Sequence, residues 1–170
     1  MRHSAPISSL CAALLCLAAC DSSDCGDNRS SLPLAGFRAS SFPTQAIALD
    51  SLGIAGIGAP ADSVMLLRDA SQAYLPLDFE KHVTSFVLRY RDIPEALFDT
   101  ITFRYDPEPW FVSTECGVIY RYEMRDIDHT THFVDSVTCP SQVIDNTPGE
   151  NIFIYFRTDS PDAAPKPVKP

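Results

Sequence analysis

The chain has little positive charge, and most of its few cationic groups are arginines. Lys and Arg together number 13 against 22 Asp and Glu, and the lysines are Lys81, Lys166 and Lys169. With a formal net charge of −9 at pH 7, the protein lacks the surplus of cations that neutralises phosphates in nucleic-acid binding. It also lacks the basic surface that adsorbs to anionic lipids. The composition therefore argues against a nucleic-acid partner and against membrane adsorption by charge.

The motifs of common catalytic sites are missing as well. Neither Gly-x-Ser-x-Gly nor His-Glu-x-x-His occurs in the sequence. The glycine-rich stretch 53–58 is not followed by Lys-Ser/Thr, and Pro60 blocks the helix that would hold a phosphate. The densest group of metal-ligand residue types, 126–132, contains His129 and His132 at a spacing that puts them on opposite faces of a strand. We interpret it as a polar hairpin loop, and we expect no enzyme, no metal and no cofactor.

Long apolar runs are absent except for a short one near the amino terminus. Residues 10–17 form an apolar core behind a polar start, which is the layout of a secretory signal and too short for a stable membrane-spanning helix. The next residues, Leu17-Ala18-Ala19-Cys20, resemble the lipobox of bacterial lipoproteins. We therefore expect residues 1–19 to be removed and Cys20 to carry the lipid that anchors the protein.

The composition after Cys20 predicts three parts. Residues 20–34 are polar, with Gly, Asn and Ser, and are typical of a flexible tether. Residues 159–170 are rich in proline, which favours a disordered tail. Residues 35–158 remain as one domain of ordinary size.

The dominant hydrophobic period within this domain is two, the period of β-strands. In 118–125, for example, Val118, Tyr120, Tyr122 and Met124 alternate with mostly charged neighbours. The pattern predicts an all-β domain, an antiparallel β-sandwich of Greek-key or immunoglobulin-like type, with a small β-barrel as the alternative. A short helix is the best helical candidate at 94–97. Further strands are expected at 35–41, 47–54, 63–68, 73–79, 84–90, 97–105, 133–139 and 152–156, with turns at 58–60, 92–94, 106–109 and 146–149.

Three cysteines, Cys25, Cys116 and Cys139, belong to the mature chain, where an oxidising compartment lets pairs persist. They allow one bridge and one spare thiol in three possible pairings, and the alternative is three free thiols. We expect 116–126 and 132–139 to form a hairpin, in which Cys116 and Cys139 lie diagonally near each other. A Cys25–Cys116 bridge would instead tie the tether to the domain, closing a loop of about ninety residues worth roughly 4–5 kcal/mol.

An aromatic and proline cluster is the strongest candidate for a contact surface. Trp110 lies next to Phe111, and Tyr105 precedes Pro107 and Pro109. Aromatic side chains are enriched in the energetically dominant parts of interfaces. We therefore predict that Trp110, Phe111 and Tyr105 contact a partner or ligand, with a place in the core as the alternative.

Several segments of the domain share the pattern of one known group. They are Phe111-Val112-Ser113-Thr114-Glu115-Cys116-Gly117, Thr130-Thr131-His132 with Asp135-Ser136-Val137, Glu150-Asn151-Ile152-Phe153-Ile154-Tyr155-Phe156, and Tyr74-Leu75-Pro76-Leu77. Behind a lipobox and Cys25, this pattern resembles a family of Bacteroidetes envelope lipoproteins of unknown function, over most of 20–157. The resemblance implies a Cys25–Cys116 disulfide with Cys139 unpaired. It also implies an outer-membrane location beside an outer-membrane β-barrel protein.

The residues after the lipobox give two conflicting indications of location. Asp21 directly after Cys20 resembles an inner-membrane retention signal, whereas the acidic run 21–24 resembles a surface-export signal. The family resemblance favours the outer membrane. We therefore predict a non-enzymatic, lipid-anchored envelope subunit that binds an outer-membrane β-barrel protein as a structural or adaptor component, for example in envelope assembly. The alternative is a glycan-binding surface lipoprotein that uses exposed aromatic side chains near Trp110.

Overall fold

The structure, a computed structural model, describes residues 31–60, 63–114 and 117–158. The expected signal 1–19, Cys20 as the expected site of lipidation, the cysteines Cys25 and Cys116, and the tail 159–170 lie outside these described residues. Within the described ranges, no helix combines the length and the apolar character that crossing a bilayer requires.

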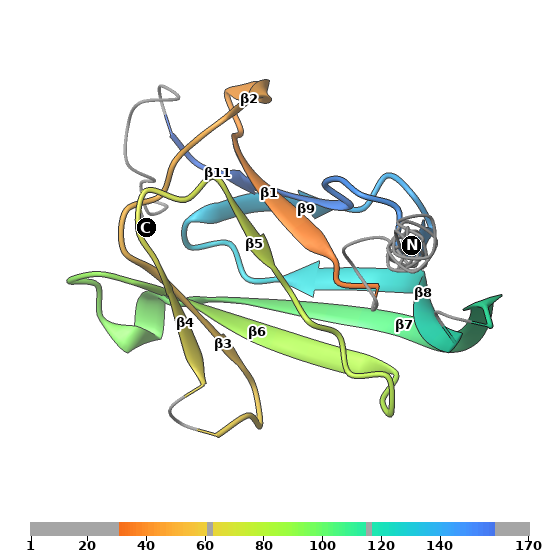
Figure 1. Cartoon of the computed structure of the whole chain (residues 1–170). Helices are drawn as coiled ribbons and strands as arrows, with labels where there is room; N and C mark the ends of the chain where they lie inside the picture. Colours follow the sequence, from red (N-terminus) through yellow and green to blue (C-terminus); the bar gives the residue numbers. More distant parts are fainter. Residues whose placement is uncertain (1–30, 61–62, 115–116, 159–170) are drawn as a thin grey trace, which may run out of the picture.

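The predicted all-β sandwich is confirmed, since two curled β-sheets pack face to face (Figure 1). The larger sheet has six strands, and each pair of neighbours is antiparallel. In spatial order they are β10 (Val143–Ile144), β8 (Gly117–His129), β7 (Asp99–Ser113), β6 (Val83–Tyr90), β3 (Leu52–Gly56) and β4 (Val64–Leu67).

The smaller sheet has five strands and contains a parallel pair. Strand β1 (Leu34–Ala39) runs parallel to β11 (Ile152–Phe156), so the first and last described strands of the domain are neighbours. Two strands pair with the other edge of β1. Strand β5 (Gln72–Tyr74) pairs with residues 34–36, and β2 (Phe42–Ala46) pairs with residues 38–39. The remaining strand, β9 (Val134–Thr138), pairs with β11.

The core fills the space between the sheets with alternate residues of each strand, as the period of two predicts. Phe37 of β1 meets Phe156 of β11 edge to face, with ring centroids 5.7 Å apart. Phe86 of β6 and Phe103 of β7 meet similarly at 6.1 Å. Edge-to-face contacts of this kind add about 0.5–1.5 kcal/mol to the gain from burial. The inward-facing side chains that are fully buried also include Leu88, Ile101, Ile152 and Ile154.

One predicted turn proved to be strand. The proline-rich segment 106–109 continues β7, which runs without a break to Ser113. The reason lies in the edge that it occupies. Strand β6 pairs with β7 only as far as Arg104, and the Tyr105 N–H donates to His82 O at 3.0 Å. Pro107 and Pro109 are two and four residues after Tyr105, so their backbone nitrogens point to the same side of β7. No strand pairs with β7 on that side beyond Arg104, so the missing N–H groups of the prolines cost no hydrogen bond.

The predicted hairpin between 116–126 and 132–139 is wrong. Strand β8 pairs with β7 and continues through 126–129, whereas β9 lies in the other sheet and pairs with β11. The segment 130–133 therefore crosses between the sheets instead of closing a hairpin. The expected nearness of Cys116 and Cys139 depends on that hairpin and therefore has no support.

Several element boundaries also differ from the expected ones. Ser31 is buried and Leu34 begins β1, so the last residues of the expected tether belong to the domain. The helical candidate is a single 3₁₀ turn at Glu95–Leu97. Strand β2 was not expected, because Pro43 interrupts the alternation of apolar side chains. In the structure its side chains are exposed and it lies at the edge of the sheet, where a proline is tolerated.

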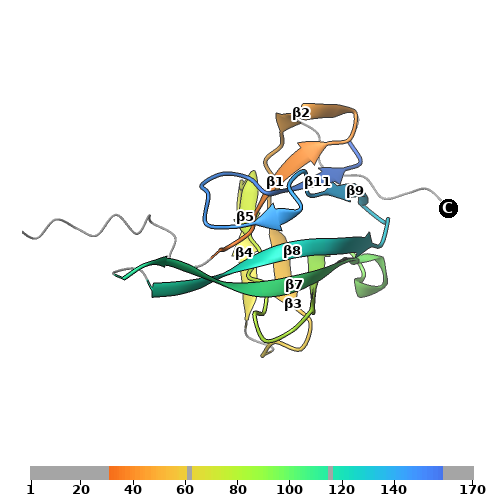
Figure 2. The ribbon, with the colours of Figure 1, turned by 90° about the vertical axis from the view of Figure 1, so that its right-hand side faces the viewer.

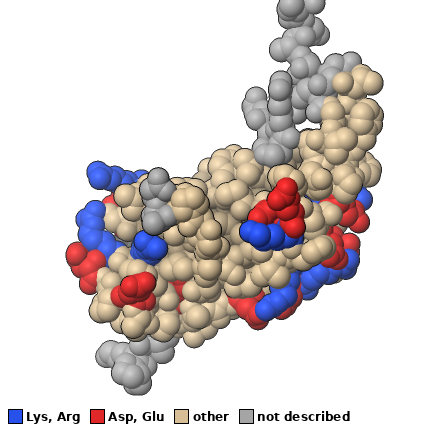
Figure 3. Space-filling view, turned by 90° about the horizontal axis from the view of Figure 1, so that it is seen from below, with Lys and Arg blue, Asp and Glu red and all other residues tan. Residues whose placement is uncertain are grey.

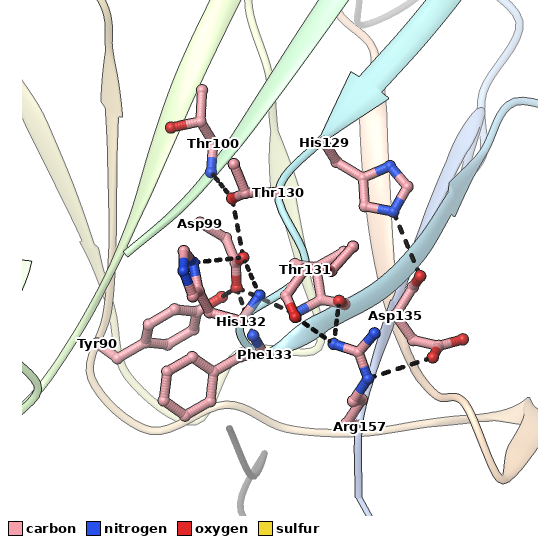
Figure 4. Close-up of polar contacts among 11 residues, drawn as sticks. Tyr90, Asp99, Thr100, His129, Thr130, Thr131, His132, Phe133, Asp135 and Arg157 are labelled. Atoms are coloured by element: carbon pink, nitrogen blue, oxygen red, sulfur yellow. Dashed lines mark hydrogen bonds and ion pairs between the residues drawn. The ribbon is translucent and has the colours of Figure 1, made fainter. Parts of the chain in front are cut away.

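The crossing between the sheets is fixed by a buried carboxylate (Figure 4). Asp99, at the start of β7, is fully buried, and its two oxygens accept five hydrogen bonds. Three donors are successive backbone N–H groups at the start of β9, so a side chain of one sheet sets the direction of a strand in the other. The donors are Thr130 Oγ1 at 2.9 Å and His132 N at 2.7 Å to Oδ1, and Tyr90 Oη at 2.8 Å, Phe133 N at 2.7 Å and Val134 N at 3.0 Å to Oδ2.

Substituting Asp99 by Asn is expected to destabilise the domain strongly. The amide has one acceptor oxygen instead of two, so at least two buried donors lose their acceptor, at about 1–3 kcal/mol each. We expect a loss of about 3 kcal/mol in the free energy of unfolding, measured as a fall in the urea midpoint. Asp126→Asn, at an exposed position of β8, is the matched control and is expected to change stability by less than about 0.5 kcal/mol. Equal midpoints for the two variants would contradict the role of Asp99.

Candidate interaction surface

The paired strands β7 and β8 extend beyond the rest of the larger sheet as a two-stranded arm (Figure 2). The arm begins where β6 ends opposite Arg104, and its strands stay paired up to Ser113 and Gly117. Gly117 has φ 75°, a left-handed conformation that favours glycine where β8 begins. We define the arm as residues 105–113 and 117–124.

Two buried tyrosines fix the base of the arm. Tyr105 is 1% exposed, and its hydroxyl donates to Asp78 O at 2.8 Å. Tyr122 packs edge to face against it and donates to Leu77 O at 3.1 Å. Burial raises the pKa of Tyr105, and it raises the pKa of Tyr122 to about 12, so both hydroxyls remain protonated donors at neutral pH. Tyr105, one of the three predicted contact residues, is thus an anchor in the core and is not part of the exposed surface.

The tip of the arm is apolar on both faces. Trp110 pairs with Ile119 and Phe111 pairs with Val118, and successive residues of a strand point to opposite faces. Trp110 is 48% exposed, Phe111 is 61% exposed and Val118 is 59% exposed. Two of the three residues predicted from the sequence, Trp110 and Phe111, therefore lie together at an exposed end of the molecule. Such a projection can be surrounded by a partner, whereas a flat patch can be covered on one side only.

The indole of Trp110 is held in place by charged neighbours. The guanidinium carbon of Arg121 lies 4.3 Å from the Trp110 ring centroid, a cation–π contact. The same guanidinium donates to Glu108, with Arg121 Nη2 2.8 Å from Glu108 Oε2. On the opposite face, Phe79 stacks on Tyr120 with centroids 4.8 Å apart. These contacts order the aromatic side chains before any partner binds, which lowers the entropic cost of binding.

Further along the arm the exposed side chains are paired charges. Arg125 Nε donates to Asp106 Oδ2 at 2.6 Å, and Asp106 Oδ1 lies 3.0 Å from His82 Nδ1. The hydrogen bond from Arg125 lowers the pKa of Asp106 and raises the pKa of Arg125. Paired charges of this kind stay hydrated and contribute little to stability. They separate the apolar tip from the body of the sheet.

In the group of potential metal ligands at 126–132, residues 126–129 belong to β8 and only 130–132 lie in the connection to β9, and the side chains do not converge. Asp126 and Asp128 both bind Arg104. His129 Nε2 lies 3.3 Å from Asp135 O, while His132 Nδ1 lies 3.5 Å from Asp99 Oδ1 (Figure 4). Across 31–60, 63–114 and 117–158, no three His, Cys, Asp or Glu side chains are grouped as a metal site requires.

Most of the domain matches the model of a known protein family. A model for a family of unknown function, DUF6452, matches residues 51–156. The chain belongs to this family. No curated protein and no solved structure matches the chain. The match confirms the expected membership of an uncharacterised domain family, and its matched range contains the whole arm and Asp99.

The sequence of this DUF6452 member predicted two of the three exposed apolar residues at the tip and missed the third, Val118. It selected Trp110 and Phe111 because they are aromatic neighbours, but it placed Val118 on a buried face. The register between the strands decides this, because Val118 lies opposite the exposed Phe111. The pattern of either strand alone does not show this pairing.

Cys139 of the DUF6452 domain is a free thiol at the end of β9. Its Sγ donates to Ser141 O at 2.9 Å, and burial raises the pKa of the thiol to about 11. The thiolate is the reactive form, so only on the order of one thiol in a thousand is ionised at pH 8.

We expect iodoacetamide to alkylate Cys139 slowly at pH 8 in the folded protein and faster as the pH approaches 11. The raised pKa leaves the thiol protonated below that range, so reactivity rises with pH through it. The rate is measured by mass spectrometry on the peptide that contains Cys139. The same protein in urea is the control, and equal rates in the two states at pH 8 would contradict the prediction.

Proposed function

We propose that this protein is a non-enzymatic, lipid-anchored subunit of the cell envelope that binds an outer-membrane β-barrel protein through the tip of its arm. The observation that carries the proposal is the apolar tip, where Trp110, Phe111 and Val118 are each about half or more exposed. Soluble monomers rarely gather large apolar side chains at a projecting end unless a partner covers them. The proposed role is structural or that of an adaptor, serving envelope assembly.

The tip has the physical properties of a binding element. Burying an aromatic or large aliphatic side chain completely is worth about 1.5–3 kcal/mol, so covering these side chains supplies a useful part of a binding free energy. The arm holds the tip away from the sandwich, while Tyr105 and Tyr122 fix its base in the core. A rigid arm loses little conformational freedom when it binds.

The lipid expected on Cys20 supports the same function by confining the domain to the membrane surface. A short flexible tether of about ten residues raises the effective concentration of the domain near a membrane partner to the millimolar range. A tip of modest intrinsic affinity then suffices for stable association. The sequence from Leu17 to Cys20 is the support for this part of the proposal.

Substituting Cys20 by Ala is expected to abolish lipidation and release the protein from the membrane fraction. The thiol is the only atom to which the diacylglycerol can be attached. Incorporation of labelled palmitate and fractionation of cell envelopes measure the two effects. Cys25→Ala, which leaves the lipobox intact, is the control and is expected to remain lipidated. A wild-type protein with an unmodified amino terminus at another residue would refute the anchoring.

The double substitution Trp110→Ser with Phe111→Ser is expected to weaken capture of the membrane partner by about tenfold or more without unfolding the domain. Both side chains are largely exposed, so little core packing is lost. A tagged form is extracted in mild detergent, and the β-barrel protein that stays bound is quantified. Phe42→Ser, an aromatic position of the other sheet that is 40% exposed, is the matched control. Equal capture by the two variants would place the contact elsewhere.

A glycan-binding role is the second candidate, and the half-exposed indole of Trp110 favours it. Aromatic faces with a polar neighbour such as Arg121 suit amphipathic ligands. Because Trp110 is the single tryptophan of the chain, its fluorescence reports directly on the tip. Saturable quenching by a saccharide would favour this role over binding of a β-barrel protein.

A further inference from the structure

Two arginines on the outer face of the larger sheet form no ion pair among the described residues. They are Arg68, just after β4, and Arg89 in β6, and both are exposed. Every other arginine that the structure describes lies within 4 Å of a carboxylate. In a chain with a net charge of −9, two unpaired guanidinium groups beside one cavity are unusual. Unpaired cations of this kind are a typical means of binding an anion.

The two arginines line the same open cavity, which has a volume of about 500 Å³. Its floor is Gly53 of β3, which pairs with Leu66 of β4 on one side and with Arg89 of β6 on the other. A Cβ atom at Gly53 would lie 3.3 Å from the Arg89 Cβ, so the glycine leaves the hollow open. One wall is apolar, since Leu66 is 74% exposed and Val64 lies beside it. The volume falls within the roughly 300–1,000 Å³ typical of small-molecule sites.

The charge at the cavity matches a phosphate monoester. Arg91 also lines it and forms a long ion pair with Asp50, 3.6 Å from Nη1 to Oδ2. Three guanidinium groups and one carboxylate leave a surplus of two positive charges. A phosphate monoester carries about −1.5 to −2 charges at pH 7, whereas a carboxylate carries one. Seen from below, charged side chains of both signs lie at the left and over the right half of this face, with mostly uncharged atoms between the two groups (Figure 3).

We propose that this cavity binds an amphiphile with a phosphate monoester head, which Arg68, Arg89 and Arg91 hold while the apolar part lies on Leu66 and Val64. The site is on β3, β4 and β6, whereas the apolar tip is on β7 and β8. The proposal is therefore independent of the partner proposed for the arm, and either one can fail without the other.

Binding is tested with hexyl phosphate and inorganic phosphate, by calorimetry on the full chain purified in a nonionic detergent. We expect hexyl phosphate to bind about tenfold or more tightly than inorganic phosphate, because at least two methylene groups are buried. The double substitution Arg68→Ala with Arg89→Ala is expected to lower the affinity for both ligands by tenfold or more. Leu66→Ser is expected to remove the advantage of the alkyl chain only. Arg104→Ala, an exposed and paired arginine on the same face of the sheet, is the matched control and is expected to change neither affinity.

Three results would overturn the proposal. The first is no saturable binding of hexyl phosphate to the wild-type protein. The second is unchanged binding in the double arginine variant, with an unaltered melting temperature showing that it is folded. The third is equal affinity for inorganic phosphate and hexyl phosphate, which would show an anion site without an apolar part.

Discussion

The carboxylate of Asp99 is the contact that joins the two sheets. A buried charge costs several kcal/mol unless enough donors surround it, and here five donors do so. Three of them are the successive N–H groups of 132–134, which would otherwise be unpaired as the chain leaves one sheet for the other. Burial and the neighbouring Asp99 raise the pKa of Tyr90, so its hydroxyl remains a donor at neutral pH. The position of β9, and with it the pairing of β11 and β1, depends on this group.

The same larger sheet produces the arm because its strands differ in length. Strand β6 stops opposite Arg104, and from there β7 and β8 continue as a pair that has no third strand beside it. An isolated two-stranded ribbon is marginally stable in water. Here Tyr105 and Tyr122 anchor it in the core, and the ion pairs around Arg121 and Arg125 add contacts along its length. The prolines of the arm protect its open edge from pairing with other chains.

The distribution of charge separates two surfaces on one small domain. Along the arm nearly every charged side chain has a partner of opposite sign, so the tip beyond it is left as an apolar end. At the other end of the sheet, Arg68 and Arg89 are without such partners among the described residues, and an apolar wall faces them. One surface is suited to a protein and the other to an anionic amphiphile. A lipid-anchored member of DUF6452 would present both close to a membrane.

The sequence by itself determined the class of fold and most of the strands. Alternation of apolar side chains is a local property, so 84–90, 97–105, 118–125 and 152–156 were predicted close to their observed positions. It also singled out Trp110 and Phe111, because aromatic side chains are enriched in the energetically dominant parts of interfaces.

Only the tertiary structure decided which strands are neighbours, and hence where the surfaces lie. Pairing depends on residues far apart in the chain: Asp99 directs the start of β9 across more than thirty residues, and this is why the predicted hairpin after Cys116 is wrong. Tyr105 and Trp110 are both aromatic residues next to prolines in the sequence. Tyr105 is buried because it packs on Tyr122 and bonds to Asp78 O, whereas Trp110 lies farther out along the arm and is half exposed. The sequence could not predict the arginine cavity, because Gly53, Leu66 and Arg89 become neighbours only through the register of three paired strands.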